Sequence, residues 1–254
     1  MPVNHSLKDN VCRVKRFLRS PMYKIKNKWR RFFGFDKSWL FKSRHEFTAG
    51  SWQWLALTEM WYGGMKVGEF SKQNTGGDRM SPILSPTCHG YGEIYEKFLK
   101  KYLKLSCVKN PIIIEIGILN GSGLAIWCDL FPKARVIGLD IDLSNFEANR
   151  PFLEKVGAFA LNKPEIYLFD QLDPVAAASV LQQILGESKV AIAIDDGCHC
   201  LQSIDITFNA VFPHLADQFV YFIEDNLQTY DYLSPKNKKI KFSQYNEMTV
   251  AFQN

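Results

Sequence analysis

Two periods of apolar residues alternate along residues 91–225 of this 254-residue chain. Short apolar runs with the length of buried strands lie at 112–117, 136–140, 166–169, 190–195 and 220–224. Apolar residues at helical spacing lie at 92–105, 122–131, 145–157, 174–186 and 201–211. This alternation predicts an α/β fold, a Rossmann-like doubly wound sheet of mostly parallel strands with helices on both faces.

The segments on either side of this region have simpler patterns. Ile240–Tyr245 and Met248–Phe252 are strand-like and only two residues apart, which predicts a C-terminal antiparallel hairpin. Upstream, we expect a helix over Trp52–Tyr62. Residues 63–90 are rich in Gly, Ser, Pro and Thr and predict a long loop, of the kind that covers or binds a ligand.

The first fifty residues are strongly basic. They contain 13 Lys and Arg against three Asp and Glu, although the whole chain carries only +5. Their apolar residues recur every three or four positions, so we expect a basic helical extension over 1–75 before a main domain over 76–254. A helix over 8–34 suits an anionic membrane surface. The alternative is that this helix docks on its own core or on a second subunit.

The composition limits the class of protein. With 46% hydrophobic and 22% charged residues, the chain has a globular composition. It has neither an apolar run of about 20 residues, as a membrane span requires, nor the pattern of a secretory signal. The six cysteines are scattered and include no CxxC pair. We therefore expect a cytoplasmic protein, with peripheral contact to the inner face of the membrane if the basic helix binds lipid.

Adjacent acids follow two of the predicted strands. Asp196 ends one apolar run, and Glu224 and Asp225 end another. Neighbouring strands lie about 4.8 Å apart, so these carboxylates converge and raise one another's pKa unless a cation neutralises them. Oxygen ligands of this kind suit Mg²⁺, and His199 lies beside them in the sequence. The sequence therefore predicts a metal site with a histidine next to it.

Each of these acids also has a plainer interpretation. Asp195 and Asp196 would cap the helix that begins near Leu201, and Glu224 and Asp225 would start a solvated loop. The joint occurrence of the acids at neighbouring strand ends favours the metal site.

A strand, a glycine-rich turn and a helix start follow one another over 112–123. The glycines are spaced GxxxGxG, unlike the GxGxxG of dinucleotide-binding turns. Glu115 precedes them and suits an ammonium group, while Asp140 ends the next strand, where an acid takes the hydroxyls of a ribose. An ammonium and a ribose together indicate S-adenosylmethionine. The alternative is a tight turn that binds nothing.

Residues 76–254 resemble the class I S-adenosylmethionine-dependent methyltransferases. Within that class they are most similar to metal-dependent sugar O-methyltransferases of the mycinamicin and macrocin type. The ordered motifs that carry the resemblance are Gly77-Asp78-Arg79, His89-Gly90-Tyr91 with Tyr95, Glu115–Gly123, Gly138–Asp142, Asp170-Gln171, Asp195–His199, Ile223-Glu224-Asp225 and Phe242…Tyr245.

The resemblance implies a role for each matched residue. The cofactor would be held by Glu115, Gly117, Gly121 and Asp140, with Asp170 and Gln171 near its adenine. Mg²⁺ would be bound by Asp196, Glu224 and Asp225, and His199 would be the catalytic base. We also expect Asp195 to face the methyl end of the cofactor. His89 and Tyr91 either lean over the ligands or fix the loop, and Asp78 and Arg79 are equally open.

Two departures from the family pattern concern the substrate. Cys198 stands where the family usually has serine, which changes one hydrogen bond near the metal. Only residues 226–239 separate the second acidic strand end from the hairpin, where fuller methyltransferases place a longer helix and loops. An open site of this kind suits a large glycan or glycolipid.

These features predict a Mg²⁺-dependent O-methyltransferase of a sugar hydroxyl in a glycan, glycolipid or glycosylated metabolite, as in polysaccharide biosynthesis. Asp196 and His199 would carry the chemistry, because a metal makes the hydroxyl more acidic and the histidine accepts its proton. The alternatives are a catechol-like diol as substrate, a nucleic-acid substrate, and an inactive membrane-surface scaffold. Nucleic acid is disfavoured because the aromatic residues of the basic segment lie on its apolar stripe. A homo-oligomer is compatible with the sequence.

Overall fold

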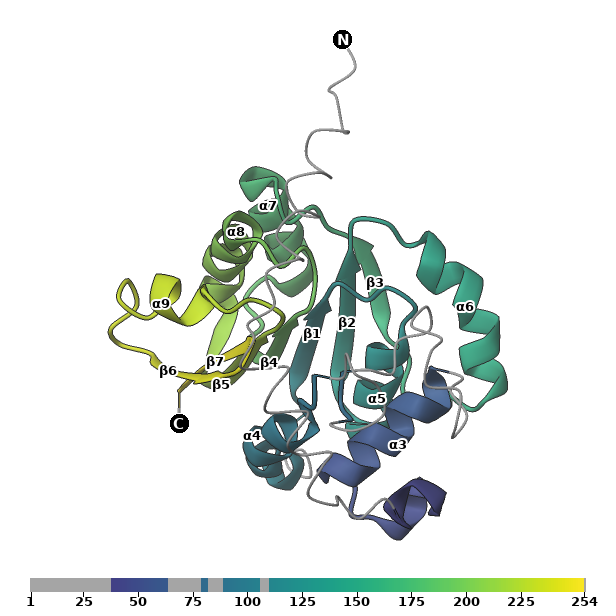
Figure 1. Cartoon of the computed structure of the whole chain (residues 1–254). Coiled ribbons are helices and arrows are strands. Elements are labelled where there is room, and N and C mark those ends of the chain that lie inside the picture. Colours follow the sequence, from purple (N-terminus) through teal and green to yellow (C-terminus); the bar gives the residue numbers. More distant parts are fainter. Residues whose placement is uncertain (1–37, 64–78, 82–88, 106–109, 254) are drawn as a thin grey trace.

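The computed structural model describes residues 38–63, 79–81, 89–105 and 110–253 (Figure 1). The expected basic helix over 8–34, Asp78 and most of the 63–90 loop lie outside the described residues. The sheet and the helices that position the candidate site are all within them.

A seven-stranded sheet forms the centre of the molecule, in the order β3-β2-β1-β4-β5-β7-β6. The first five strands in the sequence run parallel, and β7 is antiparallel to both β5 and β6. The predicted fold, a parallel doubly wound sheet with a terminal hairpin, is confirmed. The strands are β1 (Ile112–Ile116), β2 (Arg135–Asp140), β3 (Glu165–Leu168), β4 (Val190–Asp195), β5 (Leu215–Ile223), β6 (Lys241–Tyr245) and β7 (Met248–Gln253).

Helices cover both faces of this sheet (Figure 1). One hydrophobic cluster packs α3, α4, α5 and α6 against one face, and a second packs α7 and α8 against the other. The helices are η1 (Ser38–Phe41), η2 (Arg44–Glu46), α3 (Trp52–Tyr62), α4 (Gly92–Leu105), α5 (Ser122–Leu130), α6 (Ser144–Lys155), α7 (Pro174–Leu185), α8 (Leu201–Val211), η4 (Phe212–His214) and α9 (Thr229–Leu233).

Two elements differ from the pattern-based expectation. Strand β5 begins at Leu215, five residues earlier than expected, because the exposed Asp217 and Gln218 interrupt its apolar run. Helix α9 lies within the 226–239 connection, which the sequence described only as short. Its five residues are too few for a clear helical period, and it is anchored by the buried Leu233.

Helix α3 is part of the main hydrophobic core. Ser51 caps its N-terminus, and Leu55 and Tyr62 are fully buried in the cluster that contains α4 and α5. The Tyr62 hydroxyl donates to Asp129 at 2.6 Å, and Arg44 pairs with the same carboxylate at 2.7 Å. Residues 44–62 are therefore packed on the domain, and the expected division at residues 75 and 76 stays a prediction.

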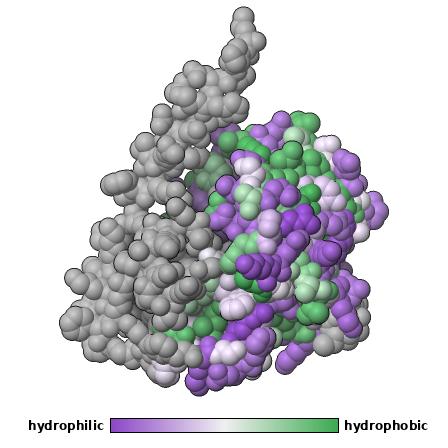
Figure 2. Space-filling model, turned by 90° about the vertical axis from the view of Figure 1, so that its right-hand side faces the viewer, coloured by the Kyte–Doolittle hydropathy of each residue, from purple (hydrophilic) through white to green (hydrophobic). Residues whose placement is uncertain are grey.

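The outer surface is mixed in character. Figure 2 shows hydrophilic and hydrophobic residues interspersed over the described part of one face. Among the described residues, no helix is long and apolar enough to cross a membrane.

Strands β1, β2, β4 and β5 end side by side. Backbone hydrogen bonds tie each strand end to its neighbour, from Gly117 to Leu139, from Asp196 to Ile116, and from the Glu224 amide to the Asp195 carbonyl. The carboxyl ends of these strands therefore bring the glycine-rich turn and the acidic residues together, as ligand sites in open α/β sheets require.

Candidate active site

The turn between β1 and α5 depends on two glycines. Gly117 has φ +85° and Gly121 has φ +80°, a backbone conformation that residues with a Cβ rarely adopt. A Cβ on Gly117 would meet the backbone carbonyl of Asp196, and one on Gly121 would meet the Phe146 ring. The turn is therefore held closely against the end of β4.

Among the described residues, one carboxylate oxygen of Glu115 has no hydrogen-bond partner. The residue is 1% exposed, and its Oε1 accepts from Arg79 Nη1 at 2.7 Å. Its Oε2 is buried and has no hydrogen-bond partner within the part of the chain that the structure describes. Leaving a buried acceptor unpaired is costly. An ammonium group would satisfy this oxygen, so Glu115 fits the role that the sequence predicts for it.

Asp140 supports the glycine-rich turn directly. Its Oδ2 accepts from the backbone amides of Ile118 at 2.9 Å and Leu119 at 3.1 Å. The carboxylate thus links the end of β2 to the turn after β1. Carboxylate oxygens have several lone pairs, so Asp140 retains acceptor capacity for the hydroxyls of a ribose.

Two exposed apolar side chains flank this acid, and sequence reasoning missed them. Leu119 is 55% exposed and Ile141 is 65% exposed, which provides apolar contact area beside Asp140. Their positions in the sequence could have indicated them, because Leu119 lies in the glycine-rich turn and Ile141 directly follows β2. Asp170, expected near an adenine, is half-buried and caps its own turn by accepting from the Leu172 amide at 2.8 Å.

Gln171 and Asp195 lie beneath the site. Asp195 is 2% exposed and accepts from Gln171 Nε2 at 2.8 Å, and burial raises the pKa of this carboxyl to about 6. Gln171 also donates to Thr207 on α8 at 3.1 Å and accepts from the Cys198 amide at 2.8 Å. Both side chains therefore support the 196–199 loop from the α8 side, and their expected place at the cofactor stays a prediction.

Three ligand atoms converge above this loop. Asp196, His199 and Asp225 each direct one potential metal-ligand atom to a common place, within 4.8 Å of one another. His199 and Asp225 have φ +58° and +57°, and such strained backbone is concentrated at functional sites. Two carboxylates and an imidazole can hold a divalent cation. His199 is the third member of this group, and the expected role of Glu224 as a metal ligand stays a prediction.

The Asp225 carboxylate is held by two groups from the segment before α4. The Tyr91 hydroxyl donates to Oδ1 at 2.7 Å, and His89 Nδ1 lies 3.0 Å from the same oxygen. Burial alone would raise the pKa of Asp225, but the bonds and charge of His89 hold it below its usual range. Tyr91 and His89 thus fix the acid, and Glu247 in the hairpin turn joins His89 and Asp225 in a second such group.

Arg79 lies between the strand ends, with its side chain 11% exposed. Its guanidinium lies 2.7 Å from Glu115, 3.0 Å from Glu224 and 3.7 Å from Asp196. Tyr95 adds a second hydrogen bond to Glu224, and the guanidinium lies 5.7 Å from the centre of its ring. Glu224 is therefore buried against an internal cation on the side of α4, and it lies outside the three-residue group. The sequence left the role of Arg79 open.

One guanidinium does not neutralise this cluster of carboxyl groups. Burial raises the pKa of Asp196 and of Glu224 to about 8 in each case, although Arg79 lowers both. Burial thus disfavours the charged form of both groups in the protein alone. A cation bound at the site would lower both pKa values and so favour the charged carboxylates. The sequence-based argument for a metal rests on the same effect.

The plainer interpretations of Asp195, Asp196 and Glu224 are wrong. The N-cap of α8 is Cys200, whose sulfur accepts from the Ser203 amide, and neither Asp195 nor Asp196 caps the helix. Glu224 is 1% exposed and so does not begin a solvated loop.

The comparisons with known proteins point to O-methyltransferases. No protein-family model matches the chain. It is 25% identical over 155 residues to demethylmacrocin O-methyltransferase of Streptomyces fradiae, a match that covers 57% of this chain and 34% of the relative. It is 28% identical over 126 residues to L-olivosyl-oleandolide 3-O-methyltransferase of Streptomyces antibioticus, covering 46% and 28%.

A solved structure with a related arrangement is the MycE methyltransferase from the mycinamycin biosynthetic pathway, in complex with Mg and SAH. It has a TM-score of 0.49 and 19% identity, over 65% of this chain and 50% of that chain. The sequence matches confirm the predicted resemblance to S-adenosylmethionine-dependent O-methyltransferases. The matched region spans only about a third of the length of the curated relatives.

Proposed function

We propose that this chain transfers a methyl group from S-adenosylmethionine to a sugar hydroxyl, with Mg²⁺ at the strand ends. The observation that carries the proposal is the unpaired Oε2 of Glu115, which lies at the end of β1 beside the Asp196–His199–Asp225 group. Acceptors for an ammonium group and for a metal cation thus meet at adjacent strand ends.

The relatives support the reaction class. Both curated proteins are named as O-methyltransferases, one of demethylmacrocin and one of L-olivosyl-oleandolide. Because this chain spans about a third of their length, a glycan, glycolipid or glycosylated metabolite as acceptor is part of the proposal, and so is a role in polysaccharide biosynthesis.

The cofactor would be held by the β1–α5 turn. Glu115 Oε2 would accept from the ammonium group, Asp140 would take the ribose hydroxyls, and Leu119 and Ile141 would contact the adenine. Gly117 and Gly121 keep the turn close to β4, which leaves room for a ligand where side chains would stand. Gln171 and Asp195 would support the loop beside the ligand.

His199 is oriented to accept a proton. Its Nδ1 lies 3.3 Å from the backbone carbonyl of Glu224, so an Nδ1–H donated there leaves the lone pair on Nε2. That nitrogen lies 3.8 Å from Asp196 Oδ1, beside the proposed metal position. When bound, Mg²⁺ supplies positive charge that makes a nearby hydroxyl more acidic. Asp196 and Asp225 would then be the protein ligands of the metal, and His199 Nε2, which keeps its lone pair, would take the proton of the substrate hydroxyl.

Separate binding measurements test the two halves of the site. Glu115→Gln is expected to weaken S-adenosylhomocysteine at least tenfold in calorimetry while leaving Mn²⁺ binding unchanged. Asp225→Asn is expected to weaken Mn²⁺ binding at least tenfold while leaving S-adenosylhomocysteine binding unchanged. Lys100→Gln, at an exposed residue of α4, should change neither. If wild-type protein bound no S-adenosylhomocysteine with or without Mg²⁺, the proposal would be rejected.

Two further sequence-based expectations stay proposals. Contact of residues 8–34 with an anionic membrane rests on their basic, amphipathic pattern. Assembly into a homo-oligomer would place a second chain near the short 226–239 connection.

A further inference from the structure

Two cysteines flank His199 at the start of α8. Cys198 and Cys200 are both half-buried, and the Cys198 thiol donates to the Cys200 sulfur at 3.6 Å. His199 has φ +58°, and this left-handed turn brings the two cysteine side chains to the same side of the loop. The proposed methyl transfer uses neither thiol. The pair is therefore a feature of the loop that the methyl-transfer chemistry does not require.

The two sulfurs are near bonding distance. A disulfide has an S–S separation of about 2.0 Å, so sulfurs at 3.6 Å have to approach each other by about 1.6 Å. Cys200 is fixed as the N-cap of α8, where its sulfur accepts from the Ser203 amide at 3.4 Å. The Cys198 amide is fixed by a 2.8 Å hydrogen bond to Gln171. The approach therefore changes the backbone of the one residue between the two anchors, which is His199.

The position of His199 depends on two contacts with the segment after β5. Its Nδ1 lies 3.3 Å from the Glu224 carbonyl, and its own carbonyl accepts from Asn226 Nδ2 at 2.8 Å. The first contact sets the direction of the ring, and the second holds the backbone. A small ring closed through the two sulfurs contains the His199 backbone, so closing it alters the dihedral angles on which both contacts depend.

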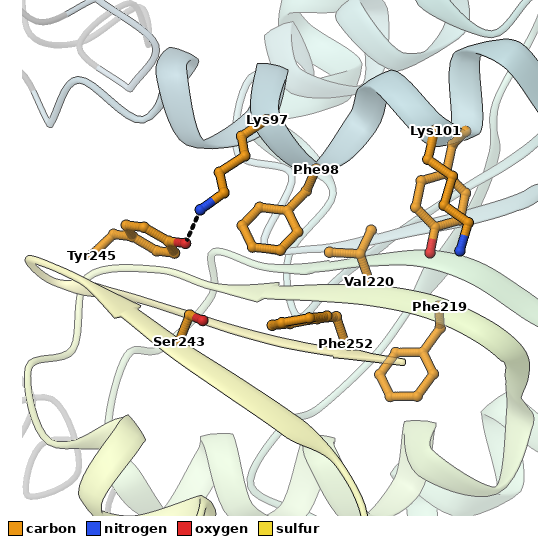
Figure 3. A pocket seen from close by; sticks show the side chains of 9 residues that line it. Lys97, Phe98, Lys101, Phe219, Val220, Ser243, Tyr245 and Phe252 are labelled. Carbon is orange, nitrogen blue, oxygen red and sulfur yellow. Dashed lines mark hydrogen bonds between the residues drawn. The ribbon is translucent and has the colours of Figure 1, made fainter. Parts of the chain in front are cut away.

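The end of β5 is held in place by aromatic packing. The ring of Phe222, two residues before Glu224, lies 6.1 Å from the ring of Phe98 on α4. Phe98 also lines a cavity between α4 and the hairpin, where Figure 3 shows it facing Phe252, with the two ring centres 5.2 Å apart. This aromatic layer fixes the Glu224 carbonyl, so a change in the loop moves His199 relative to it.

We propose that Cys198 and Cys200 are a modification site, oxidised to a disulfide by a small-molecule disulfide of the glutathione class, and that the bond turns His199 away from the proposed metal position. The movement of His199 concerns the proposed base, so its consequence for catalysis rests on the proposed function. Formation of the disulfide does not.

The oxidation is a thiol–disulfide exchange in two steps. The Cys200 thiolate attacks one sulfur of the oxidant RS–SR, which forms a mixed disulfide and releases RS⁻. The Cys198 thiolate then attacks the Cys200 sulfur and releases the second RS⁻. The two thiol protons end on the two RS⁻ groups, so two cysteine thiols become one disulfide and RS–SR is reduced to two RSH.

Peptide mapping of the full chain tests for the bond. Residues 190–236 contain these two cysteines and no other, with no Lys or Arg before Lys236, so trypsin releases both in one peptide. After treatment with oxidised glutathione and alkylation of the remaining thiols, we expect this peptide to carry no alkyl group and to have lost two hydrogen atoms. Dithiothreitol should reverse the change. Cys198→Ser should stop at the mixed disulfide of glutathione with Cys200.

Nuclear magnetic resonance tests for the movement of His199. The ring resonance, assigned with His199→Gln, should shift when the disulfide forms. Its broadening by Mn²⁺ should fall at least twofold, because the ring then lies farther from the metal. The matched control is Cys198→Ser/Cys200→Ser, since serine also caps a helix but cannot form the bond. Oxidised glutathione should change neither signal in this variant.

Either of two results would overturn the proposal. One is a 190–236 peptide that stays fully alkylated or is joined to another cysteine of the chain. The other is a Cys198–Cys200 disulfide that leaves the His199 resonance where it was. Absence of Mn²⁺ binding to the reduced wild type would instead reject the proposed metal site, and the shift of the His199 resonance would still decide whether the disulfide moves the ring.

Discussion

Arg79 is the residue on which the acidic strand ends depend. It is the cation that the structure places between Glu115 and Glu224, two carboxylates that are each 1% exposed. Buried charges are stable only when they are paired and hydrogen-bonded. The arginine therefore fixes the distance between the proposed cofactor residue and the end of β5.

Replacing Arg79 is expected to destabilise the protein strongly. Arg79→Gln leaves two buried carboxylates without their cation, and breaking a buried pair in this way costs about 3–5 kcal/mol. Urea unfolding measures the change. Arg135→Gln is the matched control, because its pair with Glu165 is about one-third exposed and such pairs contribute about 1 kcal/mol or less. Equal losses in the two variants would contradict a special role for Arg79.

Adjacent acidic residues have different contacts because their side chains point in different directions from the strand ends. Successive side chains of a strand point to opposite faces, so Asp195 faces α8 whereas Asp196 faces the site. Glu224 continues the alternation of β5 and lies against Tyr95, while the positive φ of Asp225 turns it toward Asp196. The sequence predicted which acids meet. It could not show which way each one points, because nothing in the residue types indicates that positive φ.

At the scale of elements, the β1–α5 turn is the most constrained piece of backbone. Gly117 combines a positive φ with close contact to the carbonyl of Asp196. Gly157 has φ +95°, but nothing lies within 4 Å of the position of its Cβ. A comparison of substitutions at Gly117 and Gly157 therefore distinguishes the cost of a positive φ from the cost of a steric clash.

Alanine at these two glycines should have different costs. Gly157→Ala is expected to cost about 1–2 kcal/mol, from the left-handed backbone alone. Gly117→Ala adds displacement of the β4 end, so we expect a larger loss of stability and loss of S-adenosylhomocysteine binding. Thermal unfolding with and without that ligand measures both effects. Equal behaviour of the two variants would mean that the turn is not held against β4.

The short helix η4 makes stability depend on pH through His214. This residue is 7% exposed, and burial, with the nearby Lys189 charge, lowers its pKa. Because the unfolded state has the higher pKa, near 6.5, it binds a proton first as pH falls. His214 therefore destabilises the fold progressively below about pH 6.5 and has no such effect above it.

The substitution His214→Gln isolates this effect from the other titrating groups. The difference in unfolding free energy between wild type and variant should shift in favour of the variant between pH 7.5 and pH 5. Urea unfolding at the two pH values measures it. A difference that does not change with pH would show that His214 titrates in the same way in the folded and unfolded states.

The elements themselves were largely predictable, for a physical reason. Helix α8 was predicted at its observed bounds, and β4 likewise, because buried parallel strands and amphipathic helices carry strong periodic patterns. Helix α9 and the first half of β5 were missed, since a five-residue helix and an exposed strand start have no such pattern. The role of Arg79 stayed open because its partners lie 36 and 145 positions away in the sequence.

At the scale of the whole molecule, the cluster of acids makes stability dependent on bound cations. Ligands that bind only the folded state stabilise it in proportion to the logarithm of their concentration. We expect the melting temperature to rise with Mg²⁺ concentration in wild type and to stay flat in Asp225→Asn. Differential scanning calorimetry at constant ionic strength measures this. A similar rise in both proteins would place the cation elsewhere.

The C-terminal hairpin also has a consequence for how the protein is made. Its turn brings Glu247 to His89 and Asp225, and the Glu247 carbonyl accepts from the Asn226 amide at 2.8 Å. Strand β7 lies between β5 and the edge strand β6. On the ribosome, the acidic cluster therefore cannot be completed until the segment through Gln253 has emerged from the exit tunnel. A nascent chain stalled before that point would lack the contact of Glu247 with His89, however well its first five strands had paired.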